Sequence, residues 1–77
     1  EMMFVKVQAE GPARSEILRT VEIFRCKVVD VSSSEMTIEA TGDHDKLDAI
    51  LSLLHRFGIK EVARTGSVAM RRSKKCE

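Results

Sequence analysis

The chain has 77 residues and a mass of 8.6 kDa, which leaves room for one small domain because a domain usually occupies about 100–200 residues. An apolar content of 43%, with one proline and four glycines, excludes a disordered or fibrous chain. Thirteen basic and twelve acidic residues leave a formal net charge of +1, so no overall electrostatic field directs the chain to nucleic acid or to a membrane. The composition predicts one compact, soluble domain, too small to be a self-contained enzyme with a large cofactor.

The cysteines and the hydropathy pattern indicate the kind of compartment. Cys26 and Cys76 have no paired spacing, which argues against a disulfide framework and against a CxxC metal site. We expect Cys26 to be a buried small hydrophobic residue in a reducing compartment. No apolar run approaches about 18 residues, so we expect neither a membrane span nor a signal peptide. Because the chain begins directly in a strand pattern at Glu1, we expect it to be a fragment of a longer protein.

The first half of the chain reads as a strand followed by a helix. From Met2 to Gln8, apolar residues alternate loosely with polar ones, which is the period of a β-strand. Gly11 and Pro12 interrupt this pattern. From Ala13 to Arg25, the apolar residues have helical spacing and predict one buried stripe, which consists of Ile17, Leu18, Val21 and Phe24.

Two strands, a helix and a final strand follow. Lys27–Val31 and Glu35–Thr41 are predicted strands separated by a turn of three serines, Ser32 to Ser34. Gly42 ends the second of these strands, and Asp43 is expected to cap a helix that Gly58 terminates. The last strand is predicted over Ile59–Thr65, with a possible extension past Gly66 to Met70.

The predicted order of elements is therefore β-α-β-β-α-β. With right-handed crossovers, this order predicts an α+β, ferredoxin-like sandwich, in which two helices cover one face of a four-stranded antiparallel sheet. The domain is expected to span residues 1–72 and to be followed by a disordered tail, residues 73–77. Residues 71–77 carry four positive charges and lack apolar residues apart from Cys76, which favours a frayed terminus.

No catalytic, cofactor-binding or metal-binding residue is predicted. An RNA-binding module of this fold would stack bases on aromatic residues of its central strands, whereas only Phe4 could do so here. His44 and His55 would lie about 16 Å apart along a helix, too far to share one metal ion. His44 between Asp43 and Asp45 is interpreted as part of a solvated helix start, and the serines are interpreted as a turn.

The sheet face that the helices leave uncovered is the candidate site of self-association. In a ferredoxin-like sheet, the first and third strands are central neighbours, so the two strands should place on this face, side by side, Met2, Phe4, Thr37 and Glu39. A phenylalanine is out of place on a wetted surface. The pattern predicts a homo-oligomer formed through this face, although Phe4 could instead pack under a loop or against a missing part of the protein.

Several segments also resemble a known family, the small regulatory subunit of acetolactate synthase (acetohydroxyacid synthase). The resemblance is to the C-terminal domain of that subunit and runs from Met2 to about Arg72 without gaps. Cys26, His55 and residues 74–77 depart from the family pattern. The segments that carry the resemblance are Glu22-Ile23-Phe24-Arg25, Lys27-Val28-Val29-Asp30-Val31, Thr37-Ile38-Glu39 with Thr41-Gly42, Lys46-Leu47-Asp48-Ala49, and Phe57-Gly58-Ile59-Lys60-Glu61-Val62-Ala63-Arg64-Thr65-Gly66.

The resemblance implies a regulatory, non-catalytic role. The parent protein would bind the catalytic subunit of acetolactate synthase, raise its activity and confer feedback inhibition by branched-chain amino acids, above all valine. Thiamine diphosphate, Mg and FAD would belong to that catalytic partner, and the parent chain would also carry an N-terminal ACT domain. No effector-binding residue can be transferred to this chain, so the effector site is unknown.

The resemblance also implies a location in the cell and ranks two other function classes lower. The cytoplasm is expected, or a plastid or mitochondrion in a eukaryote. A small nucleic-acid-binding domain of ferredoxin-like fold is the alternative function, and a stand-alone enzyme comes last. We expect neither nucleic acid nor a membrane among the partners.

Overall fold

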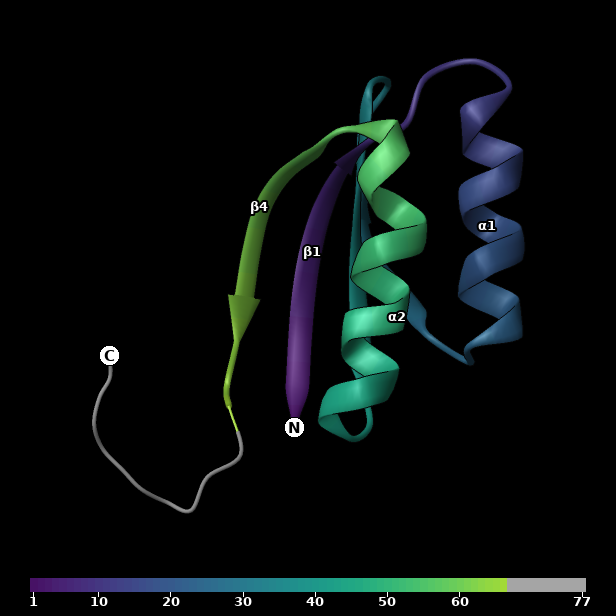
Figure 1. Cartoon of the computed structure of the whole chain (residues 1–77). Coiled ribbons are helices and arrows are strands. Elements are labelled where there is room, and N and C mark those ends of the chain that lie inside the picture. The colour runs from purple at the N-terminus through teal and green to yellow at the C-terminus, as the bar shows by residue number, and fades with distance from the viewer. Residues whose placement is uncertain (67–77) are drawn as a thin grey trace.

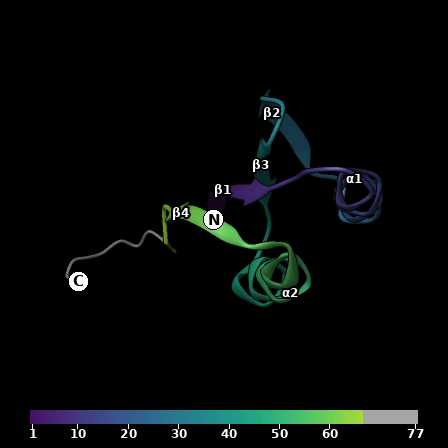
Figure 2. The ribbon, with the colours of Figure 1, turned by 90° about the horizontal axis from the view of Figure 1, so that it is seen from above.

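The computed structural model describes residues 1–66, and these residues form one sheet with two helices (Figure 1). The predicted order of elements is confirmed. It consists of β1 (Met2–Gln8), α1 (Ala13–Ile23), β2 (Lys27–Val31), β3 (Glu35–Thr41), α2 (His44–Leu54), a 3-10 turn η1 (His55–Phe57) and β4 (Ile59–Arg64). The sheet has the strand order β2-β3-β1-β4, and each neighbouring pair is antiparallel. Both helices lie on the same side of the sheet when it is seen from above (Figure 2). This is the predicted ferredoxin-like sandwich.

The core lies between the sheet and the helices. The alternation of buried and outward-facing residues along β1 and β3 creates it. Every second residue of these central strands is buried, and the residues between them face away from the helices. The two helices contribute one apolar stripe each. The buried core residues are Met3, Val5, Val7, Ala9, Ile17, Val21, Met36, Ile38, Ala40, Leu47, Ile50 and Leu54.

One cross-strand row links all four strands on the covered face. Val5 in β1 lies opposite Ile38 in β3 on one side and opposite Val62 in β4 on the other, and Ile38 also lies opposite Val28 in β2. Exposure rises toward the edge of the sheet, because Val5 is 0% exposed, Ile38 is 1% exposed and Val62 is 43% exposed. β-Branched side chains pack well against such cross-strand neighbours, so this row fixes the register of the sheet.

Helix α1 ends at Ile23, two residues earlier than the sequence pattern predicts. The backbone N–H of Cys26 donates to the carbonyl of Val21 at 2.8 Å, and that of Arg25 donates to Glu22 at 3.2 Å. These two bonds form a Schellman motif, which requires a left-handed residue, and Arg25 takes that role with a φ of 57°. The motif was missed because a glycine usually occupies this position.

Helix α2 begins as predicted and ends sooner. The carboxylate of Asp43 accepts a hydrogen bond from the backbone N–H of Lys46 at 2.8 Å, which confirms it as the N-cap. The α-helical pattern stops at Leu54 and tightens into η1. Gly58 then closes the segment with a φ of 97°, and its N–H donates to the carbonyl of His55 at 3.1 Å.

Strand β2 forms one edge of the sheet and is the least buried strand. Its register with β3 shifts between Val28 and Asp30, so the strand contains a bulge that the sequence did not indicate. The N–H of Ser32 donates to the carbonyl of Glu35 in β3 at 2.9 Å, so the N–H of Val31, one residue earlier, points to the free edge. There it donates to Oδ1 of Asp30 at 3.1 Å. The predicted serine turn is confirmed, because Ser32 Oγ accepts backbone N–H groups of the turn.

Two further expectations need correction. The last strand ends at Arg64, one residue before the predicted Thr65, although the N–H of Thr65 still donates to the carbonyl of Met2 at 2.9 Å. Cys26 packs against the core but is only half-buried, and this partial burial raises the pKa of its thiol above the usual value. The predicted extension to Met70, the domain end at residue 72, the tail 73–77 and the charge cluster 71–75 lie outside the described residues.

Candidate interaction surface

The sheet face that the helices leave uncovered, here called the open face, presents side chains from all four strands. On β1 and β3, these are the residues between the buried ones. The register places four cross-strand rows there. The open face consists of Met2 opposite Thr41; then Ala63, Phe4, Glu39 and Lys27; then Glu61, Lys6, Thr37 and Asp30; then Gln8 opposite Glu35.

All four residues predicted for self-association belong to this face, but their neighbours differ in part from the expectation. Phe4 lies directly opposite Glu39. Met2, by contrast, lies opposite Thr41, and Thr37 lies opposite Lys6. The period of two predicted the face of each residue correctly, whereas the pairing register depends on contacts between strands far apart in the chain.

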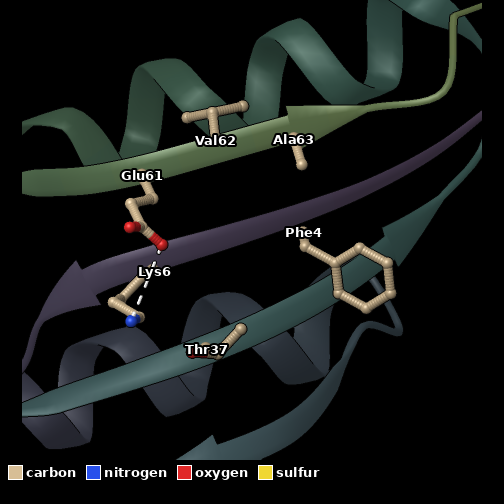
Figure 3. A pocket seen from close by; sticks show the side chains of 6 residues that line it. All are labelled: Phe4, Lys6, Thr37, Glu61, Val62 and Ala63. Carbon is tan, nitrogen blue, oxygen red and sulfur yellow. Dashed lines mark ion pairs between the residues drawn. The ribbon is translucent and has the colours of Figure 1, made fainter.

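Phe4 projects from β1 beside a shallow hollow. The side chain is 38% exposed, and its ring reaches over the neighbouring strand β3 (Figure 3). The hollow opens beside the ring along β1 and β4. Its lining residues are Phe4, Lys6, Thr37, Glu61, Val62 and Ala63. The open face therefore carries an aromatic projection and a depression next to each other.

Two pairs of oppositely charged side chains lie on the open face, beside Phe4 and the hollow. Lys6 Nζ lies 3.6 Å from Glu61 Oε1 across the β1–β4 pair (Figure 3). Lys27 lies opposite Glu39 in the β2–β3 register. The Lys6–Glu61 pair was not predicted, because only the register between the first and last strands brings the two residues together.

A second polar cluster joins the start of β1, the end of β4 and the first turns of α2. Arg64 donates from Nε to Glu1 Oε2 at 2.9 Å and from Nη1 to Asp48 Oδ1 at 2.7 Å. Its Nη2 lies 3.3 Å from His44 Nδ1. Because a guanidinium has only donors, Nδ1 accepts, and Nε2 of His44 carries the proton toward Asp48 Oδ2, 3.0 Å away. This cluster was not predicted, because Glu1, Asp48 and Arg64 are distant from one another in the chain.

The cluster around Arg64 shifts the pKa values of Asp48 and Arg64. The hydrogen bond from Arg64 holds the pKa of Asp48 below its ordinary value of 3.8, and the hydrogen bonds to Glu1 and Asp48 raise the pKa of Arg64. The folded pKa of Asp48 is thus lower than the unfolded pKa. Its contribution to stability is present above about pH 4 and is lost as the pH falls through the folded pKa.

We therefore expect Asp48→Asn to flatten the acid side of the stability curve. Between about pH 5 and pH 2, the variant should lose less melting temperature than the wild type, because one group that must be protonated is gone. Thermal unfolding followed by circular dichroism at several pH values measures this slope. The same substitution in an Arg64→Ala background, where the donor to Asp48 is absent, is the control and should change the slope less. Parallel curves for Asp48→Asn and the wild type would contradict the assignment.

The residues examined for chemistry take ordinary positions. His44 is exposed and contacts Asp48, and Asp43 acts as the helix cap, which agrees with the predicted solvated start of the helix. Within residues 1–66, no three His, Cys, Asp or Glu side chains are placed to hold a metal ion together. No helix in that range is long and apolar enough to cross a membrane. The arrangement offers an interaction surface.

Comparisons with known proteins agree on one family. A family model described as "Small subunit of acetolactate synthase" matches residues 1–73. The acetolactate synthase small subunit of Aquifex aeolicus is 59% identical over 73 residues, which cover 94% of this chain and 38% of the relative. The chloroplastic small subunit 2 of Arabidopsis thaliana is 51% identical over 74 residues, which cover 96% of this chain and 16% of the relative.

A solved structure carries the same fold. The crystal structure of the acetolactate synthase small subunit from Thermotoga maritima superposes with a TM-score of 0.78 at 42% identity, and the match covers 84% of this chain and 40% of the other. The chain thus spans well under half the length of these relatives. The family match over almost the whole chain confirms the resemblance noted in the sequence: the chain belongs to the acetolactate synthase small-subunit family and corresponds to the C-terminal part of that subunit.

Proposed function

We propose that this chain is a regulatory, non-catalytic domain that binds the catalytic subunit of acetolactate synthase. In this role, it supports activation of the catalytic subunit and its feedback control by branched-chain amino acids such as valine. The observation that carries the proposal is the family match over residues 1–73. Relatives of 59% and 51% identity are named small subunits of this enzyme, and a small subunit acts together with a partner.

The surface chemistry supports binding over catalysis. The open face presents an exposed aromatic ring, that of Phe4, and aromatic side chains are enriched in protein interfaces. Glu39 lies opposite Phe4, so a nucleic acid with a base stacked on the ring would bring its phosphates close to a carboxylate. We therefore favour a protein partner over nucleic acid.

The cofactors belong to the partner in this proposal. Thiamine diphosphate, Mg and FAD would be bound by the catalytic subunit, and the family's N-terminal ACT domain would precede this domain in the parent chain. The domain would act in the cytoplasm, or in a plastid or mitochondrion of a eukaryote.

Reconstitution tests the proposed function. Acetolactate formation from pyruvate is measured for the chain alone, for the catalytic subunit of the same organism alone, and for the mixture with and without valine. We expect no turnover by the chain alone and a higher rate for the mixture than for the catalytic subunit, because the domain contributes binding only. An unrelated protein of similar size at equal concentration is the control. Sustained turnover by the chain alone, or an unchanged rate in the mixture, would contradict the proposal.

A further inference from the structure

The helix α1 is attached to the rest of the domain more weakly than α2. We propose that α1 leaves the sheet and unwinds as a unit while the sheet and α2 stay folded, so that the domain has a second, open conformation. The inference goes beyond the proposed function, because it concerns a conformational change within this domain. Three features of α1 carry it, namely its burial, its two ends and its polar contacts.

The burial of α1 is small. The helix places two residues in the buried core, Ile17 and Val21, whereas α2 places three there. Two other apolar residues of α1, Leu18 and Ile23, are 42% and 69% exposed, and surface that is already in water adds nothing to the cost of opening. Seen from above, α1 stands apart from α2, on the side nearer β2 (Figure 2). Opening of α1 therefore leaves the core between the central strands and α2 in place.

The two ends of α1 are less well capped than those of α2. At the start, Pro12 offers no side-chain acceptor to the free N–H groups, whereas Asp43 caps α2. At the other end, Arg25 takes the left-handed conformation with a φ of 57°, which strains a residue that has a side chain. After α2, Gly58 has the positive φ and carries no such strain. Unwinding of α1 releases the strain at Arg25, so the ends of α1 favour its opening.

The side chain of Arg14 attaches the start of α1 to the strands. Its Nε donates to the carbonyl of Ala9 at 3.1 Å, and its Nη2 donates to the carbonyl of Ser32 at 2.6 Å. These bonds connect the first turn of α1 with the residue after β1 and with the turn between β2 and β3. The ion pair between Glu16 and Arg56 lies at the surface and contributes less. We therefore expect Arg14 to set how often α1 opens.

A detached α1 would not remain helical. It has 11 residues, and isolated helices shorter than about 12–15 residues are marginal in water. Detachment and unwinding therefore coincide, and the backbone N–H groups of α1 become accessible to solvent together. The part of the sheet beneath α1 is exposed in the same step, so the open form presents an apolar surface that the closed form hides.

Native-state hydrogen exchange of the 77-residue chain, followed by NMR, tests this inference at each backbone N–H group. The amides of residues 17–21 should exchange as one group, at least about 10-fold faster than those of α2 and the central strands. Low concentrations of guanidinium chloride should accelerate the α1 group less steeply, because local opening exposes less surface than global unfolding. One common rate and one common slope for α1, α2 and the sheet would overturn the inference.

A substitution far from α1 separates local opening from global unfolding. Ile59→Val shortens a side chain of β4 that packs on the core, at the opposite edge of the sheet from β2. It should accelerate exchange in α2 and the central strands by about 2- to 10-fold, because it lowers the global stability. The α1 group should keep its wild-type rate, because Ile59 stays packed in the open form. Equal acceleration of α1 and α2 would show that they unfold only together.

Replacement of arginines in and after α1 tests what holds the helix closed. Arg14→Ala removes both hydrogen bonds to the strands and should accelerate exchange of α1 by about 5- to 50-fold. Arg19→Ala, at an exposed position of the same helix, is the matched control and should change the rate by less than about 3-fold.

Arg25→Gly should act in the opposite direction. Glycine is unstrained at this φ, so the α1 group should exchange about 3- to 10-fold more slowly. Far-UV circular dichroism checks that each variant keeps the wild-type fold. Equal effects of Arg14→Ala and Arg19→Ala, or faster exchange in Arg25→Gly, would contradict the proposed opening.

Discussion

Replacing Ile38 by alanine should lower the free energy of unfolding by about 2–5 kcal/mol, because the deletion removes buried methyl groups and leaves a cavity in a packed core. Ile38 is 1% exposed and lies in the middle of the Val28–Ile38–Val5–Val62 row. A domain of this size has a total stability of roughly 4–12 kcal/mol. The variant should therefore lose about 8–40 °C in melting temperature, at about 4–8 °C per kcal/mol for a domain of 60–100 residues.

Two matched variants test the cause of that loss. Thr37→Ala changes the next residue of β3, which faces away from the core, and Val62→Ala shortens a member of the same row that is 43% exposed. Both should cost less than about 1 kcal/mol, because little apolar surface is withdrawn from water at either site. Measurement at low micromolar concentration keeps association out of the comparison. Equal losses for Ile38→Ala and Val62→Ala would show that burial in this row does not set stability.

Arg64→Ala should cost about 1–3 kcal/mol, since it leaves a desolvated carboxylate without its donor. The Glu1 side chain is only 7% exposed and receives the Nε hydrogen bond of Arg64 at 2.9 Å. Arg56 provides the matched control, because its contact with Glu16 is even shorter, at 2.6 Å, but lies at the surface. Arg56→Ala should therefore cost less than about 1 kcal/mol.

A second substitution separates the buried charge from the lost packing of Arg64. Glu1→Gln in the Arg64→Ala background removes the charge that was left unpaired, so it should restore part of the lost melting temperature. In the wild-type background, the same substitution should destabilise. Thermal unfolding of the four proteins gives the coupling between the two positions. Additive effects would mean that the two side chains act independently.

The sequence was sufficient for the fold because its local signals are consistent. The alternation in Glu35–Thr41 assigns each residue of β3 to a face, and Asp43 marks the start of α2. Pairing between distant residues could not be read in the same way. Arg64 carries no local signal for its contacts with Glu1 and Asp48, and these form only once β1, β4 and α2 share one end of the sheet.

The candidate interaction surface could be predicted only in part from the sequence. The period of two placed Phe4 on the uncovered face, and the ferredoxin-like order placed β1 beside β3. The hollow beside Phe4 depends on the small side chain of Ala63 in β4, and therefore on the register of the first and last strands. The left-handed conformation of Arg25 could not be predicted either. The hydrogen bonds that end α1 hold this non-glycine residue in the left-handed region.

The bulge and Asp30 at the free edge of β2 affect the tendency of the domain to aggregate. An edge strand with free N–H groups is a template on which another chain can add a strand and begin a fibre. β2 carries two exposed valines, Val29 and Val31, which would favour such growth. The bulge breaks the straight line of the edge, and Asp30 occupies the amide of Val31 while placing a charge between the valines. We therefore expect Asp30 to act as a gatekeeper, which limits the addition of another strand at this edge.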